Sequence, residues 1–305
     1  MSFENNLRTK RVAFSALTRW AEVIDFNFVL TLLGFMAIPV ALGLNFILAF
    51  LANFTALCFA FMFNDVEDAE EDYLNEKKRK RNPVAAGIIS KGEGYVYCIL
   101  VAVISLVLYA FLAFQSGNIW PLIAGISILI VNILYSYRAT RLKNIPVLDL
   151  ISHGYMLAGG QFLVAFLTGF NITEGKQLPI SFLLFPVLMI ASVYGQLENE
   201  VRDIETDKKA GIKTIASIIG VKASQITQVV LIILTAAGGL FVVNKMNISV
   251  SWIVQSLLIL ALFMLYPIFR NFIYKDKRMF KNDIHRVIML TIIISLLLLN
   301  FKIIL

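Results

Sequence analysis

Nine apolar stretches of about 20 residues run through this chain, and a helix of that length crosses a bilayer. They are rich in Leu, Ile and Phe and do not alternate with polar residues, which favours helices over barrel strands. Only 15% of the residues are charged, against about a quarter in soluble domains. The sequence predicts an all-α integral membrane protein, one domain over 1–305, with nine transmembrane helices in a single bundle around a central cavity. The predicted spans are 23–42, 45–63, 94–114, 119–137, 147–170, 179–197, 223–243, 249–268 and 287–304.

Charge is distributed unequally between the two sides of these spans. The N-terminus and alternate loops hold 24 of the 27 Lys and Arg residues, and the other side holds only Lys176, Lys245 and Lys302. Basic loops remain in the cytoplasm, so the sequence predicts a multi-pass protein of the cell membrane with a cytoplasmic N-terminus and, after nine spans, an external C-terminus. The polar, basic start does not read as a cleavable signal peptide. The basic loops are expected at 64–92, 138–146, 198–222 and 269–286.

A short acidic pattern occurs twice, each time where an apolar run ends. The first copy places an amide and three acids at Asn64, Asp65, Asp68 and Asp72. The second copy, offset by 135 residues, has Asn199, Glu200, Asp203 and Asp207. Steps of four bring side chains to nearly one face of a helix. Acids at this density beside hydrocarbon indicate function, and carboxylate oxygens suit Mg²⁺, which often shares its ligands with a substrate's phosphates.

The two copies close the second and the sixth span, so four spans separate them and both lie on the cytoplasmic face. This spacing predicts two four-helix pseudo-repeats plus one extra helix, with an acidic cluster from each half at the mouth of the cavity. Inverted repeats, common in transporters, would need an odd offset. The interval 65–76 holds seven of the 20 acids and 198–207 holds five, which topology alone does not explain.

Cationic side chains follow both acidic motifs. The first is followed by the basic run 77–81, the second by Lys208 and Lys209, and the loop after the fourth span carries Arg138, Arg141 and Lys143. Carboxylates alone could form a cation site. Together with several cations they suit a polyphosphate, with metal on some oxygens and Arg or Lys on the others.

These motifs resemble the UbiA superfamily of intramembrane prenyltransferases. The similarity is carried by the paired acidic motifs, by the Arg-Asn-Pro-Val-Ala-Ala-Gly segment at 81–87, and by Tyr135-Ser136. It also includes the stretch 202–211 around the second motif and extends over nearly the whole chain, including the nine-span layout. The resemblance implies a transferase that joins an isoprenoid diphosphate to a lipophilic acceptor, with membrane lipids as the remaining partners. It implies neither nucleic acid nor an obligate protein partner.

The resemblance also implies roles for individual residues, with two Mg²⁺ ions as cofactor. Asp65, Asp68 and Asp72 would bind one ion, and Asp203 and Asp207 the second; these five acids are the catalytic set. Glu200, which stands where the first motif has Asp65, is expected at the second metal site. The residues expected to contact the diphosphate are Asn64, Arg81, Arg138, Arg141, Lys143 and Asn199.

One departure bears on the acceptor. Members that prenylate aromatic acceptors often have an Asp and a Tyr shortly before the second motif, where this chain has Gln196 and Asn199. The sequence around the second motif resembles the naphthoate, (di)geranylgeranylglyceryl phosphate and carotenoid-elongating branches of the superfamily. The motif does not distinguish among these three branches. Asp149, His153 and Tyr155, near the start of the fifth span, are weaker candidates for the acceptor side, and a structural role for a lone His is the commoner case.

The expected reaction ionises an allylic C–O bond. Metal and cationic side chains neutralise the departing diphosphate, and an apolar cavity keeps water from the allylic cation until the acceptor attacks. Two other classes of protein compete with this reading. A membrane transporter or lipid-binding protein could carry a cytoplasmic cation site, but it would favour charges at mid-membrane. A CDP-alcohol phosphotransferase-like enzyme also uses acidic Mg²⁺ sites, but its Gly-spaced motif is absent from this sequence.

Overall fold

The computed structural model describes residues 3–246, apart from 39, 41, 211 and 212, and also residues 292 and 294. Side chains are described from residue 10 onward, except those of 206–210. Every regular element in this part of the chain is a helix. The α-helices are α1 (Phe3–Thr18), α2 (Trp20–Met36), α3 (Leu44–Glu67), α4 (Ala69–Tyr73), α5 (Glu76–Arg81), α6 (Lys91–Ser116), α7 (Trp120–Ser136), α8 (Leu148–Gly154), α9 (Gly160–Gly169), α10 (Leu184–Ala210) and α11 (Ile215–Lys245).

Five helical segments of this part are long and apolar enough to cross a membrane. They are Leu44–Glu67, Lys91–Ser116, Leu148–Gly169, Ile180–Glu205 and Ile215–Lys245. Helix α7 is a shorter apolar helix, and α2 covers most of the first predicted span. The fifth span is a continuous helix in which a π-helical turn, Tyr155–Gly159, joins α8 to α9. The predicted spans at 249–268 and 287–304, and with them the C-terminus, lie outside the described residues except for 292 and 294.

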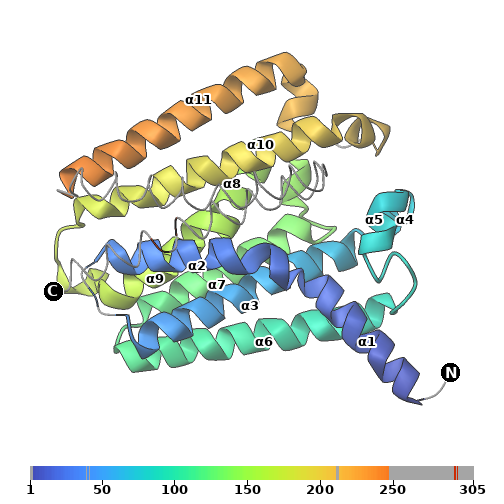
Figure 1. Ribbon diagram of the computed structural model, residues 1–305, viewed down its shortest axis with the longest axis horizontal. Coiled ribbons are helices and arrows are strands. Elements are labelled where there is room, and N and C mark those ends of the chain that lie inside the picture. Colours follow the sequence, from blue (N-terminus) through green and yellow to red (C-terminus); the bar gives the residue numbers. More distant parts are fainter. Residues whose placement is uncertain are drawn as a thin grey trace, which may run out of the picture.

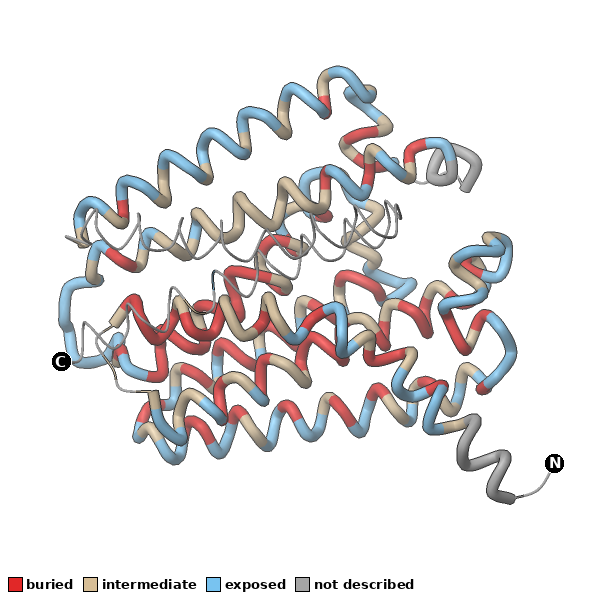
Figure 2. Tube along the Cα trace, in the orientation of Figure 1, coloured by how far each residue is buried: buried red, intermediate tan, exposed pale blue. Residues whose placement is uncertain are grey.

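The helices form a bundle with α3, α7 and α9 in its middle (Figure 1). Helix α3 packs along α6 on one side, and α10 packs along α11 on the other. Buried residues gather on the central helices, whereas the outer face of α6 is exposed (Figure 2). That face carries large apolar side chains, among them Ile99, Val103 and Phe111, as expected for a surface in contact with lipid.

Two glycines allow neighbouring helices to approach closely. A Cβ on Gly125 of α7 would lie 2.4 Å from the ring of Tyr109 on α6. A Cβ on Gly34 of α2 would lie 2.7 Å from the carbonyl oxygen of Phe162 on α9. Small residues at helix contacts are common in membranes, where packing replaces the hydrophobic effect as the main attraction between helices.

A buried polar cluster joins four helices, α2, α3, α6 and α9. The Asn53 amide of α3 donates to Thr31 Oγ1 of α2 at 3.1 Å and to the backbone oxygen of Gln161 on α9 at 3.0 Å. The hydroxyl of Tyr109 on α6 donates to Asn53 Oδ1 at 3.1 Å. These hydrogen bonds satisfy polar groups that would be costly to bury alone, and they fix the relative positions of the helices below the pocket.

The two acidic motifs have different backbone contexts. In the first, α3 ends at Glu67, Asp68 is its C-cap residue with ψ 3°, and the short helix α4 follows. The second motif lies inside α10, which continues to Ala210. The prediction of a loop beginning at residue 198 is therefore wrong, because the helix continues through the acidic residues for three more turns.

Candidate active site

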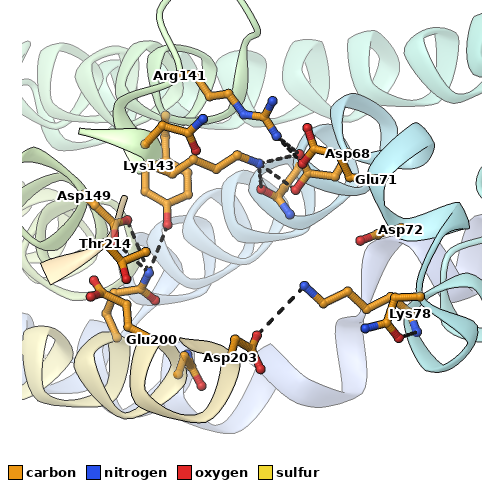
Figure 3. Close-up of a pocket in the computed structure, with 16 residues that line it drawn as sticks. Asp68, Glu71, Asp72, Lys78, Arg141, Lys143, Asp149, Glu200, Asp203 and Thr214 are labelled. Atoms are coloured by element: carbon orange, nitrogen blue, oxygen red, sulfur yellow. Dashed lines mark hydrogen bonds and ion pairs between the residues drawn. The ribbon is translucent and has the colours of Figure 1, made fainter. Parts of the chain in front are cut away.

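Side chains from both acidic motifs line one pocket between α3, α4 and α10 (Figure 3). The cavity measures about 210 Å³. The first motif contributes Asn64, Asp68 and Asp72, and the second contributes Asn199, Glu200 and Asp203. The prediction that the halves of the chain bring their motifs to a common cavity thus agrees with the described structure.

Asp68 is the most strongly paired acid of the pocket. Lys143 Nζ lies 2.6 Å from both of its oxygens, and Arg141 donates to Oδ1 at 3.0 Å. Lys143 also donates to Asn64 Oδ1 at 2.9 Å. Arg141 reaches Glu71 as well, at 2.5 Å. Burial raises the pKa of Glu71, but this bond and the charges of the nearby cations together outweigh burial and lower that pKa. The loop after α7 therefore holds the first motif through two cations.

Asp72 is buried at the opposite side of the pocket from Lys143. Its Oδ2 accepts a hydrogen bond from Asn82 Nδ2 at 3.0 Å. Burial raises the pKa of Asp72, and the Asn82 hydrogen bond offsets part of that effect. The same Asn82 amide donates to the backbone oxygen of Asp65 at 2.6 Å, so one side chain fixes both positions of the motif.

Asp65 does not reach the pocket. It is fully buried, lines neither of the cavities at this end of the bundle, and accepts from Arg81 at 3.2 Å. Because it follows Asn64 directly, its side chain lies about 100° around the helix from the line of Asn64, Asp68 and Asp72. The expectation that Asp65 joins Asp68 and Asp72 around one ion does not fit this geometry.

In the second motif, Asp203 faces the first motif across the pocket. Its Oδ2 lies 3.9 Å from Lys78 Nζ of α5, and Asn199 accepts from Arg202 at 2.8 Å. Glu200 is buried, and its Oε2 accepts from the backbone N–H of Ala216 at 2.9 Å, in the first turn of α11. Glu200 thus links α10 to the start of α11 through this hydrogen bond. From the sequence it was expected at the second metal site. The side chain of Asp207 lies outside the described residues.

The expected diphosphate-binding cations divide into two groups. Arg141 and Lys143 line the pocket. Arg81 pairs with Asp65 and borders a second, deeper cavity of about 310 Å³, and Arg138 pairs with Glu70 at 2.8 Å outside both cavities. The loop that carries Arg141 is strained, since Arg141 has φ 38° and Val147 has φ 70°. Such backbone angles are costly for residues other than glycine and gather at functional sites.

The donor set fits a hard divalent cation only if a ligand completes it. Carboxylate and amide oxygens are what Mg²⁺ prefers, and Asp68, Asp72 and Asp203 present them to one cavity. Within the described residues, however, no three carboxylate, imidazole or thiolate groups lie close enough together to hold a metal by themselves. Oxygens of a phosphorylated substrate would supply the remaining ligands.

A family model for the UbiA prenyltransferase family matches residues 27–284. The chain belongs to this family. A digeranylgeranylglyceryl phosphate synthase of Methanobrevibacter smithii is 31% identical over 196 residues, which are 63% of this chain and 64% of that protein. A lycopene elongase/hydratase of Haloarcula japonica is 30% identical over 53% of this chain and 50% of that protein. The chain thus spans about half to two thirds of the curated relatives it matches.

The fold agrees with that of solved UbiA homologues. The structure of a homologue from Archaeoglobus fulgidus, bound to GPP and Mg²⁺, has a TM-score of 0.68 at 22% identity and covers 96% of this chain and 99% of its own. Family membership and the apolar helices together make this a multi-pass membrane protein. The membrane prediction from the sequence is confirmed.

Several pocket residues of this UbiA family member were not in the expected site. They are Glu71, Asn75, Lys78, Tyr135, Asn144, Gln196 and Thr214, whereas the sequence indicates Asp149 only as a weaker candidate for the acceptor side. Lys78 belongs to a basic run whose members the sequence does not distinguish. Gln196 and Asn199 are three residues apart and therefore share a helix face, which is the signal that could have placed Gln196 in the pocket.

Proposed function

We propose that this UbiA family member transfers a prenyl group from an isoprenoid diphosphate to a lipophilic acceptor, with Mg²⁺ as cofactor. The observation that carries the proposal is the pocket in which acids of both motifs face one another beside Lys78, Arg141 and Lys143. The names of the relatives support it, since digeranylgeranylglyceryl phosphate synthase and lycopene elongase/hydratase both denote enzymes of isoprenoid compounds. So does the homologue bound to GPP and Mg²⁺.

In this proposal two metal sites are formed with the substrate. Asp68 and Asp72, with Asn64, would hold one ion, and Asp203 and Asp207, with Asn199, the other. Bound Mg²⁺ would supply Lewis-acid stabilisation of the charge that develops on the departing diphosphate. Asp65 and Glu200 would fix the backbone around these ligands, because each is buried and bonded to the segment that follows its motif.

The protein's own cations would bind the remaining phosphate oxygens. Arg141 and Lys143 lie on one side of the cavity and Lys78 on the other (Figure 3), so a diphosphate between the motifs would be contacted from both. Preorganised charges of this kind stabilise a leaving group at little reorganisation cost. The deeper cavity carries many polar and charged residues, and its apolar part, formed by Phe61, Met156 and Leu157, would receive the allylic cation and shield it from water.

We place the pocket on the cytoplasmic face, within a single domain over 1–305 that is built from two four-helix repeats. The basic loops support this orientation. Figure 1 shows the start of α1 on the same side of the bundle as α4 and α5. The repeats are supported by the packing of each motif-bearing helix, α3 or α10, against the next span, α6 or α11.

The test is metal-dependent product formation by the purified protein. Geranylgeranyl diphosphate is incubated with Mg²⁺ and a panel of acceptors, and both released diphosphate and prenylated product are measured. We expect product only with Mg²⁺, and a loss of about 100- to 1,000-fold in Asp68→Asn. Glu70→Gln is the matched control, since Glu70 lies two residues away but outside the pocket. A protein that binds the substrate yet releases no diphosphate would refute the proposal and favour transport.

A further inference from the structure

A buried carboxylate lies in the pocket on the side opposite Asp72 (Figure 3). Asp149, in the first turn of α8, is 2% exposed and lines the pocket. Gln196 Nε2 donates to both of its oxygens, at 3.2 and 3.1 Å. No ion pair of Asp149 occurs in the described part of the chain. Burying a carboxylate against neutral donors is costly, and such acids in membrane proteins are retained for function.

The surroundings of Asp149 do not suit a diphosphate. An anionic carboxylate repels phosphate oxygens, and the cations that face Asp68 and Asp203 are bonded to those acids instead. A carboxylate held by an amide accepts hydrogen bonds, so its complement is a neutral O–H or N–H group. Asp149 therefore differs from Asp68 and Asp203, the pocket acids that are paired with lysines.

The supports of Asp149 connect this position to the deeper cavity. Gln196 also donates to the hydroxyl oxygen of Tyr135 at 3.3 Å, and both residues line the pocket and the deeper cavity. His153, one turn along α8 from Asp149, borders the deeper cavity beside Met156 and Leu157. A hydroxyl bound at Asp149 would thus stand beside the part of the deeper cavity whose wall carries Met156 and Leu157, where an allylic carbon would be held.

The backbone just before Asp149 has strained dihedral angles, as is common beside functional side chains. Val147, two residues earlier, is β-branched and yet has φ 70° and ψ −49°. This conformation is strained, and strain persists only where the surrounding structure fixes it. After α8 the helix passes through the π-helical turn at Tyr155–Gly159, a feature that is frequent at functional sites.

We propose that Asp149 binds the hydroxyl group of the prenyl acceptor and takes its proton during transfer, with Gln196 and Tyr135 as positioning residues. The inference rests on the proposed function and names the acceptor class as an alcohol. The C–O bond to diphosphate breaks and its electron pair leaves with the diphosphate. The acceptor oxygen forms the new C–O bond to the allylic carbon, and its proton passes to the Asp149 carboxylate.

The experiment separates ionisation from transfer. Geranylgeranyl diphosphate and Mg²⁺ are supplied alone, so that water captures the cation, or with geranylgeranylglyceryl phosphate, which has one free hydroxyl. In Asp149→Asn we expect acceptor-dependent product to fall by about 100- to 10,000-fold, the usual contribution of a general base. Diphosphate release without acceptor and its Mg²⁺ dependence should stay within about threefold of wild type, and Asp149→Glu should recover part of the transfer.

Two controls make the outcomes distinct. Ser152→Ala alters α8 next to Asp149, since Ser152 Oγ bonds to the Asp149 backbone oxygen at 3.1 Å, and it should transfer normally. Equal losses in Ser152→Ala, loss of ionisation in Asp149→Asn, or wild-type transfer by Asp149→Asn would each overturn the role of Asp149.

If Asp149→Asn does not fold, the choice of acceptor by the wild-type protein tests the inference instead. Prenylation of a hydroxyl-free carotenoid but not of the alcohol refutes the inference and leaves the proposed function intact, whereas no metal-dependent product refutes both.

Gln196 has its own readout as a positioning residue. Gln196→Met keeps the volume and removes the amide that holds Asp149. We expect the transfer rate at saturating acceptor to fall by about tenfold or more while the KM for geranylgeranyl diphosphate is unchanged, because only the orientation of the base is lost. A purely structural role would instead lower the melting temperature and both rates together, and that result would contradict the assignment of Gln196.

Discussion

At the scale of single residues, spacing predicted the pocket-facing side chains and neighbouring segments decided the rest. Asn64, Asp68 and Asp72 are four residues apart, and all three line the pocket. The role of Asp65 depends on Arg81 and Asn82, and that of Glu200 depends on the backbone N–H of Ala216. These partners lie 16 or 17 residues further along the chain, so no local pattern reveals them.

Glu200 and Asp203 should therefore respond differently to the same chemical change. In Glu200→Gln the side-chain oxygen still accepts from Ala216, so we expect the Mg²⁺ concentration for half-maximal activity to change by less than about threefold. In Asp203→Asn a charged ligand is lost, and that concentration should rise by about tenfold or more, since charge-assisted bonds contribute roughly 1.5 to 3 kcal/mol. Titration of transfer activity with Mg²⁺ measures both. An equal rise in the two variants would make Glu200 a metal ligand after all.

At the scale of helices, the apolar runs predicted where the described spans lie. They did not predict where α3 and α10 end, although these ends position the acids of the pocket. The same spacing of acids ends α3 at Glu67 in one half and lies within the unbroken α10 in the other. The difference rests on the backbone angle of one residue, Asp68, and on the contacts of the segment after it. Side-chain periodicity carries no information on either.

The close contact of α6 and α7 gives a prediction at this scale. Gly125→Ala places a methyl group 2.4 Å from the Tyr109 ring, and overpacking of this kind costs about 1 to 3 kcal/mol. We expect a lower melting temperature in detergent and, because Tyr109 bonds to Asn53, reduced activity. Gly92→Ala on α6 is the matched control, with no neighbour nearer than 4.0 Å, and should be neutral or slightly stabilising. Equal melting temperatures for the two variants would refute this account of the contact.

At the scale of the whole molecule, the pocket belongs to neither half alone. Lys78 and the first motif come from one half and Asp203 from the other. The sequence predicted this meeting because both motifs follow apolar spans that run in the same direction. It indicated Asp149 only as a weaker candidate for the acceptor side, since a lone acid at the start of a span has no repeated partner to mark it.

Ligand binding should consequently join the two halves. We expect geranylgeranyl diphosphate and Mg²⁺ together to raise the melting temperature well above the sum of their separate effects. Each would supply ligands for the other and so tighten its binding, and tighter binding to the folded state stabilises it further. Asp203→Asn should remove most of the joint effect. A thermal shift assay with each ligand alone and with both measures it, and strictly additive shifts would contradict a shared site.

The pairing of Lys143 with Asp68 has a consequence for the order of events during binding. An arriving metal and diphosphate add opposite charges to a pocket whose own acid and cation already neutralise each other. With metal and diphosphate bound, Asp68 would ligate the metal and Lys143 would contact the phosphate, so that substrate binding would replace the ion pair between these two side chains. Lys143 would then work as a mobile counter-ion, balancing Asp68 in the empty pocket and the phosphate in the occupied one.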